Sequence, residues 1–119
     1  MNLEETARRT VAQTLCNLPE ELRSAAESVP VFLESLPDAE ITADGVDSEI
    51  LGLFVGSPRH WQNDDPGPPP QILLYLENIF DECMDAGTTF EEEVRRTYLH
   101  ELGHYLGLDE SDLAARDLD

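Results

Sequence analysis

The segment from Thr88 to Gly107 constrains the fold most, because it carries the start and stop signals of a long helix. Thr88-Thr89-Phe90-Glu91 has the spacing of a capping box, and the glutamates that follow suit the positive end of a helix. Gly107 is typical of a helix C-terminus. One arc of the helical wheel is apolar and consists of Val94, Tyr98, Leu99, Leu102, Tyr105 and Leu106. The sequence therefore predicts a helix over 88–106 with one face in a core.

The remaining segments predict an α+β fold in one domain over residues 1–119. Hydrophobic spacing and helix-start signals favour helices over 3–16 and 20–27, a short helix or turn over 77–85 and a last helical turn over 111–117. Apolar and β-branched runs predict strands over 29–36, 50–55 and 72–76. The acidic segment 38–49 is expected to be a loop. Because 50–55 is almost entirely apolar, we expect it to be a central strand.

A proline-rich loop is expected between Gly56 and Pro70, and its length is unusual for a compact domain. It contains His60 and Trp61, which would supply an extra metal ligand, a hydrogen-bond donor or an aromatic wall if the loop lines a cleft. The alternative is an exposed loop with Trp61 partly tucked against the sheet.

The charge balance excludes several classes of partner. The chain has 26 acidic and 7 basic residues, all of the latter Arg, and a formal net charge of −19. Such a field repels nucleic-acid backbones and anionic membrane surfaces, whereas metal ions and basic peptides or proteins remain allowed.

Localisation is predicted from the N-terminus and the cysteines. The first residues show neither the basic nor the apolar region of a secretory signal, and no apolar run is long enough to span a bilayer. Cys16 and Cys83 are expected to be reduced core thiols, with a single bridge between them as the alternative. We therefore expect a cytoplasmic protein.

The segment His100-Glu101-Leu102-Gly103-His104 places the motif H-E-x-x-H on the predicted long helix. Residues four apart lie on one helical face, so both imidazoles can reach one metal ion. Glu101 projects to the flank of this pair, where it can act on a metal-bound water without binding the metal. Zinc lowers the pKa of such a water towards ~7, and Glu101 then accepts its proton as general base. The alternative is a surface helix with two incidental histidines.

A catalytic zinc ion normally takes a third protein ligand. A turn at Gly107 would bring the chain back beneath the metal, and in the related pattern H-E-x-x-H-x-x-G-x-x-H the third ligand comes ten residues after the first histidine. That position is Glu110, and Asp109 is the neighbouring alternative. The remaining interpretation is that both only begin an acidic tail.

The segment from His100 to Glu110 resembles the small bacterial zincin-like metallopeptidases, whose pattern is H-E-x-x-H-x-x-G-x-x-D. Most of the chain is similar in layout, from Leu18-Pro19-Glu20-Glu21-Leu22 through Leu51-Gly52-Leu53-Phe54 to the strand after the proline-rich loop. The resemblance implies a minimal zincin domain, in which a small three- to four-stranded sheet packs against the active-site helix and an N-terminal helix. It also implies bound Zn²⁺ and peptidase activity. This chain departs from the pattern in having Glu110 where the family usually has Asp.

The leading hypothesis is a zinc-dependent metallopeptidase in which His100, His104 and Glu110 bind the metal and Glu101 is the general base. Its substrate would be a peptide or protein, with basic ones favoured by the negative charge. If the strand 72–76 lies at the sheet edge above the helix, it can pair with an extended peptide. Two alternatives are a zinc-binding module without turnover and an acidic interaction protein that docks a basic partner.

Overall fold

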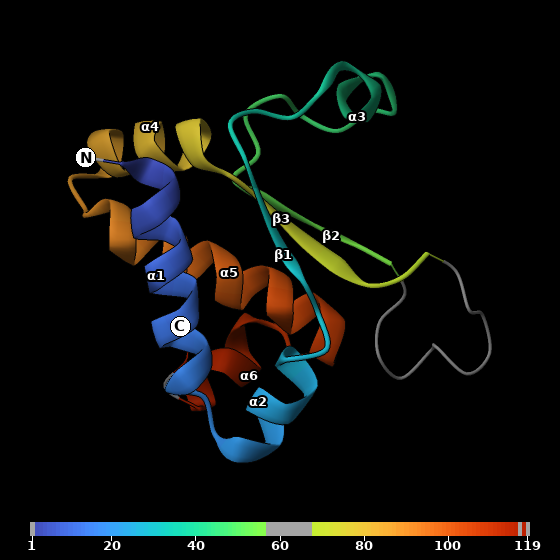
Figure 1. The fold of residues 1–119 in the computed structure, drawn as a ribbon, viewed down its shortest axis with the longest axis vertical. Helices are drawn as coiled ribbons and strands as arrows, with labels where there is room; N and C mark the ends of the chain where they lie inside the picture. The colour runs from blue at the N-terminus through green and yellow to red at the C-terminus, as the bar shows by residue number, and fades with distance from the viewer. Residues whose placement is uncertain (1, 57–67, 117, 119) are drawn as a thin grey trace.

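Most of the helices lie on one side of a small sheet, and one short helix lies apart from them beyond an end of the strands (Figure 1). The computed structural model describes residues 2–56, 68–116 and 118. Its elements are α1 (Leu3–Cys16), α2 (Glu20–Ala26), β1 (Val31–Glu34), α3 (Ala39–Ala43), β2 (Gly52–Val55), β3 (Gln71–Tyr75), α4 (Leu76–Ala86), α5 (Phe90–Leu106) and α6 (Glu110–Ala115). The predicted α+β fold is confirmed, with a three-stranded mixed sheet packed against helices.

The strand order is β1-β3-β2, so β3 is the central strand and β2 lies at an edge. β1 pairs parallel with β3 and β2 pairs antiparallel with it. The prediction that 50–55 forms a central strand is therefore wrong, and the strand predicted at 72–76 does not lie at an edge. An apolar run indicates that a strand is buried, but it does not identify which strands pair with it.

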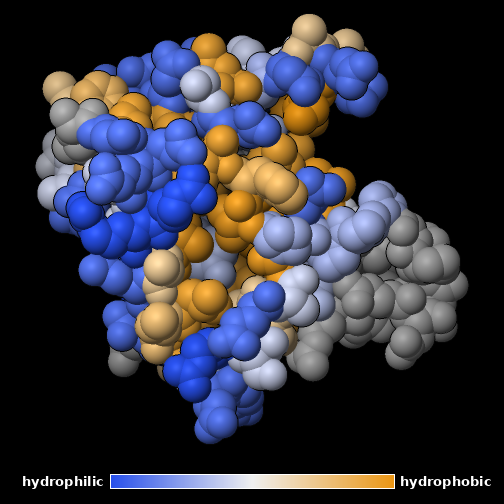
Figure 2. All heavy atoms as spheres, viewed as in Figure 1, coloured by the Kyte–Doolittle hydropathy of each residue, from blue (hydrophilic) through white to orange (hydrophobic). Residues whose placement is uncertain are grey.

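The two faces of the sheet have different surroundings. Ile72 and Leu74 of β3 are fully buried and pack in the core with Val94, Tyr98 and Leu102 of α5. On the opposite face, the register aligns Phe32, Leu73 and Leu53 in one row across the three strands. Phe32 is 46% exposed. In Figure 2, hydrophilic side chains cover α1, and hydrophobic ones are exposed beside it along the middle of the molecule.

Local hydrogen bonds set the helix boundaries, with two differences from the sequence prediction. The N-cap of α5 is Thr89, whose hydroxyl accepts the Glu92 N–H at 3.1 Å, so the cap lies one residue later than predicted. The segment expected to be a loop contains α3, because the carboxylate of Asp38 accepts the Ile41 N–H and caps a short helix. Gly107 ends α5 with φ 73°, as predicted for a C-terminal glycine.

Three other predictions concern single residues or spans. Cys83 is buried, whereas Cys16 is exposed, so only Cys83 is a core thiol; neither is disulfide-bonded. His60 and Trp61 lie outside the described residues. Within the described ranges, no helix combines the length and the apolar composition needed to cross a bilayer.

Candidate metal centre

Two histidines on the exposed face of α5 point their Nε2 atoms at one another. His100 and His104 are one helical turn apart, and the two Nε2 atoms are separated by 3.4 Å. Two nitrogen ligands about 2.0–2.1 Å from one zinc ion, at the tetrahedral angle, lie roughly 3.3–3.4 Å apart. The opposite face of the helix holds this arrangement in place, because Leu99 and Leu102 are only 2% exposed. The two imidazoles therefore have the separation that a shared zinc ion requires.

Glu101 completes the cluster. Within the described part of the chain, His100, Glu101 and His104 form a group whose ligand atoms all lie within 4.8 Å of one another. Glu101 is only 9% exposed, and burial raises the pKa of its carboxyl group. The nearby imidazoles and a hydrogen bond from the backbone N–H of Phe54 act in the opposite direction. Glu101 thus presents a desolvated carboxylate beside the histidine pair.

The edge strand β2 brings Phe54 to this carboxylate. The Tyr75 N–H donates to the Leu51 carbonyl at 2.9 Å. In an antiparallel pair, hydrogen-bonded and non-hydrogen-bonded positions alternate along each strand. Since Leu51 is bonded to the central strand, the next residue, Gly52, is not, and neither is Phe54 two residues later. The N–H and C=O groups of Gly52 and Phe54 therefore point to the free edge of β2. The ring of Phe54 packs against Tyr105 of α5, with centroids 5.8 Å apart. The free edge of the sheet therefore runs beside the histidine pair.

Gly52 allows β2 to approach α5 closely. A Cβ atom at this position would lie 2.8 Å from Cγ2 of Thr97 and 3.2 Å from Cγ of Glu101. Both distances are shorter than ordinary carbon–carbon contacts, which lie at about 3.5–4.0 Å. Only glycine therefore fits between the edge strand and the helix without displacing one of them.

The two candidates for the third ligand have different surroundings. Asp109 is the N-cap of α6: its carboxylate accepts the Asp112 N–H at 2.8 Å, and the Asp112 carboxylate accepts the Asp109 N–H at 3.0 Å. Glu110 is the first residue of α6, and one of its carboxylate oxygens lies 3.7 Å from Nδ1 of His100. Its side chain is 85% exposed. The structure thus brings Glu110, one residue beyond the cap, next to the histidine pair.

A cavity of about 350 Å³ opens between the start of β2 and α5. His100, Glu101 and Glu110 line it on one side, and Leu51 and Gly52 line it on the other. The candidate metal centre therefore faces an open space next to the sheet edge.

One ion pair beside this cavity, with a buried carboxylate and an exposed guanidinium, was not predicted from the sequence. Glu93 is one of the glutamates in the first turn of α5, and it is only 2% exposed. Nη1 of Arg96 and the hydroxyl of Thr88 donate to Oε1 of Glu93 at 2.5 and 2.9 Å. The i,i+3 spacing of Glu93 and Arg96 was the available signal. The pair fixes Arg96 one helical turn before His100.

In a comparison with protein families, residues 26–119 match a family model described as zincin-like metallopeptidase. The matched region includes the whole sheet and the cluster of His100, Glu101 and His104. Comparison with curated proteins finds no significant match. The family model covers well over half of the chain, and the fold and the His-Glu-His cluster agree with it. The chain belongs to the zincin-like metallopeptidase family.

Proposed function

We propose that this protein hydrolyses peptide bonds with the help of a zinc ion. The observation that carries the proposal is the cluster on α5, where two Nε2 atoms 3.4 Å apart lie next to the buried carboxylate of Glu101. Two imidazoles and a carboxylate suit zinc, and a carboxylate beside them suits proton transfer.

His100, His104 and Glu110 would hold the ion. Glu110 is favoured over Asp109 because the Asp109 carboxylate already accepts a hydrogen bond as the cap of α6. The exposed side chain of Glu110 can turn from Nδ1 of His100 towards the Nε2 pair without breaking a buried contact. When bound, zinc supplies Lewis acidity, which polarises a carbonyl group and makes a coordinated water more acidic.

Glu101 would be the general base. One carboxylate oxygen takes a proton from the attacking water, and the carboxyl group then gives it to the departing amine. Burial favours this role because a carboxylate with little water around it binds a proton more readily. The hydrogen bond from the Phe54 N–H fixes the orientation of the carboxylate relative to the sheet edge.

The substrate would be an extended peptide paired with the free edge of β2, since the N–H and C=O groups of Gly52 point outward there. This strand replaces the one predicted at 72–76, which lies in the middle of the sheet. The net charge of −19 favours basic peptides over acidic ones.

The proposal is tested by measuring metal content and peptide hydrolysis on protein purified without chelator. Glu101→Gln should retain zinc, because Glu101 is not a ligand, while the rate of hydrolysis falls by about two orders of magnitude or more. His104→Ala should lose both zinc and activity. Glu110→Ala should weaken zinc binding, and the matched variant Asp109→Ala should weaken it less.

Three outcomes would contradict the proposed function. Metal-replete wild-type protein without zinc at His100 and His104 would remove the metal centre. Hydrolysis that is unchanged in Glu101→Gln would remove the general base. Zinc that is retained in wild type without any turnover would instead support a non-catalytic zinc module.

A further inference from the structure

One face of the sheet, the open face, points away from the helices that pack on the strands. Ile72 and Leu74 of β3 are buried in the core, so the alternating side chains of Leu73 and Tyr75 lie on the other side of the sheet. The helices that pack on the strands, α1, α4 and α5, contribute their apolar side chains to the core. The open face consists of Phe32, Glu34, Gln71, Leu73, Tyr75, Leu53 and Val55.

An apolar row crosses the middle of the open face. Phe32, Leu73 and Leu53 are register neighbours on β1, β3 and β2. Phe32 is 46% exposed, and the two leucines are partly exposed. Neighbouring strands are about 4.8 Å apart, so the row is about 10 Å long, which matches about two turns of an α-helix. Exposed apolar patches with a polar rim are typical of protein interaction sites.

The rim of the open face is acidic at one end. Glu34 lies on the face itself, next to Tyr75 in the register. The segment that follows β1 and contains α3 has no basic residue, and its acidic residues, all exposed, are Asp38, Glu40, Asp44, Asp47 and Glu49. Figure 1 shows this segment beyond one end of the strands. A partner that covers the open face therefore meets negative charge at this end.

Hydrogen bonds fix the acidic segment to the end of β3. The Glu77 N–H donates to the Ser35 carbonyl at 3.1 Å. The side-chain amide of Asn78 donates to the carbonyls of Ser48 and Ile50, both at 2.9 Å. Both ends of the segment are thus bound to the start of α4, so the acidic rim keeps its place relative to the apolar row.

Tyr75 marks the junction between the apolar row and the acidic rim. It is only 1% exposed, yet it is not part of the core cluster on the other side of the sheet. Within the described residues, its hydroxyl is the buried side-chain polar atom without a hydrogen-bond partner, which is unfavourable. Burial raises the pKa of Tyr75, and the nearby carboxylates of Asp38 and Glu34 raise it further. A Lys or Arg side chain at this junction can pair with the carboxylates and donate to the hydroxyl oxygen.

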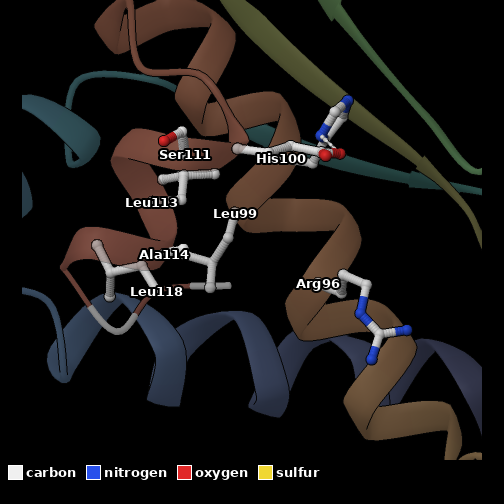
Figure 3. Close-up of a pocket in the computed structure, with 8 residues that line it drawn as sticks. Arg96, Leu99, His100, Ser111, Leu113, Ala114 and Leu118 are labelled. Atoms are coloured by element: carbon white, nitrogen blue, oxygen red, sulfur yellow. Dashed lines mark ion pairs between the residues drawn. The ribbon is translucent and has the colours of Figure 1, made fainter.

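The open face is separate from the candidate metal centre. The 350 Å³ cavity beside the metal centre is lined by the start of β2 and by α5. A further cavity of about 570 Å³, shown in Figure 3, has His100 at one end, and its lining residues belong to α5 and the C-terminal segment. Phe32, Leu73 and Leu53 line neither cavity. A partner on the open face therefore leaves the cleft at His100 accessible.

We propose that the open face binds a basic amphipathic helix of a partner protein. Apolar side chains one turn apart on this helix cover Phe32, Leu73 and Leu53, and its Lys or Arg residues meet Glu34 and Asp38. The inference goes beyond the proposed function, because it assigns a second surface. A helix suits the face better than a strand, since the face offers side chains rather than free backbone groups. A second copy of this chain is disfavoured, because it would bring a further net charge of −19 to the same surface.

The test measures the binding of a fluorescein-labelled helical peptide of about 14 residues by fluorescence anisotropy. Leucines recur every three or four positions in the peptide, and lysines fill the other positions. The peptide should bind the wild type, and its affinity should fall as NaCl rises. A peptide with glutamate in place of lysine, and one with the same composition but leucines on all sides of the helix, should each bind more weakly by about tenfold or more.

Two pairs of variants locate the binding surface. Phe32→Ser should weaken binding about tenfold, because the exposed half of the ring loses its contact with the peptide. Its control is Met84→Ser on α4, where a side chain that is 68% exposed is removed outside the open face, and affinity should change less than about twofold. Glu34→Gln should weaken binding about two- to threefold, whereas Glu82→Gln, which removes the same charge from α4, should not. Equal effects within either pair would overturn the proposal.

NMR spectra and two further measurements exclude the alternative occupants. The peptide should shift the methyl signals of Leu53 and Leu73 and leave those of Leu102 in the core unchanged. His104→Ala should bind the peptide as tightly as the wild type does, even though it is expected to lose zinc and hydrolysis; loss of peptide binding in this variant would place the peptide at the metal centre and overturn the proposal. A wild-type dimer in sedimentation velocity that Phe32→Ser dissociates would assign the face to a second copy and also overturn it. If Phe32→Ser does not fold, Leu53→Gln replaces it.

Discussion

Gly52→Ala should loosen the contact between β2 and α5. The added Cβ would lie 2.8 Å from Cγ2 of Thr97 and 3.2 Å from the carbonyl oxygen of Leu73. Neither neighbour can yield easily, because Thr97 is buried with a stiff β-branched side chain and Leu73 belongs to the central strand. The edge strand must therefore move outward by about 0.7–1.2 Å to restore ordinary carbon–carbon contact with Thr97.

The cost follows from this displacement. Overpacking of this kind typically costs about 1–3 kcal/mol. The lower chain entropy of alanine in the unfolded state returns about 0.4–1 kcal/mol. A net loss of about 1–2 kcal/mol should lower the melting temperature by roughly 4–8 °C. The outward shift should also weaken the hydrogen bond from the Phe54 N–H to Glu101.

Calorimetry and amide hydrogen exchange measure the two effects, and Gly103→Ala is the control. A Cβ at Gly103 would lie 2.9 Å from the Leu108 carbonyl oxygen. This variant therefore crowds the contact between α5 and the segment just after it, and it does not affect the contact between α5 and β2. Both variants should have a lower melting temperature than the wild type. Only Gly52→Ala should increase the rate of hydrogen exchange of the Phe54 amide by more than the loss of global stability explains. An unchanged melting temperature in Gly52→Ala, or equal exchange at Phe54 in both variants, would refute the close-approach argument.

Two further predictions concern charge and pH. Seven arginines cannot neutralise 26 carboxylates, so repulsion between the carboxylates destabilises the fold at low salt. The melting temperature should therefore rise with NaCl between 0.01 and 1 M, where the Debye length shortens from about 30 to about 3 Å. A melting temperature that stays flat or falls over this range, measured with and without chelator, would contradict the prediction. Burial raises the pKa of Tyr98 from its ordinary value of 10.0 to about 12. The neutral phenol therefore contributes its full stability to the fold below pH ~10, and this contribution is lost as the pH rises through 12. By pH 11 the loss is roughly 1 kcal/mol. Urea denaturation at pH 8 and 11 should show a smaller loss in Tyr98→Phe than in wild type, and equal losses would exclude the shift.

The basis of the candidate site was predictable because it is local. The i,i+4 spacing of His100 and His104 fixes both imidazoles on one face of α5, and Gly107 fixes where the helix ends. The apolar arc through Val94 and Leu102 fixes which face enters the core. Even the cap of α5 was misplaced by only one residue, since Thr88 and Thr89 have similar capping chemistry.

The burial and the contacts of a side chain were not predictable where they depend on segments that lie far away in the sequence. Glu93 follows the helix start and looks solvated in sequence, yet the fold buries it and pairs it with Arg96. The choice between Asp109 and Glu110 also depended on where α6 begins, because the residue that caps a helix uses its carboxylate for the cap.

By itself, the sequence determined the α+β class, the long helix and the His-Glu-His pattern, because hydrogen bonds and side-chain spacing within a few residues specify them. Only the tertiary structure decided that β3 is central and β2 is an edge strand, that Gly52 lets this edge approach α5, and that the Phe54 N–H reaches Glu101. Strand order depends on pairing between segments far apart in the chain. An apolar segment can occupy a central or an edge position, so its hydrophobicity does not specify which strands pair with it.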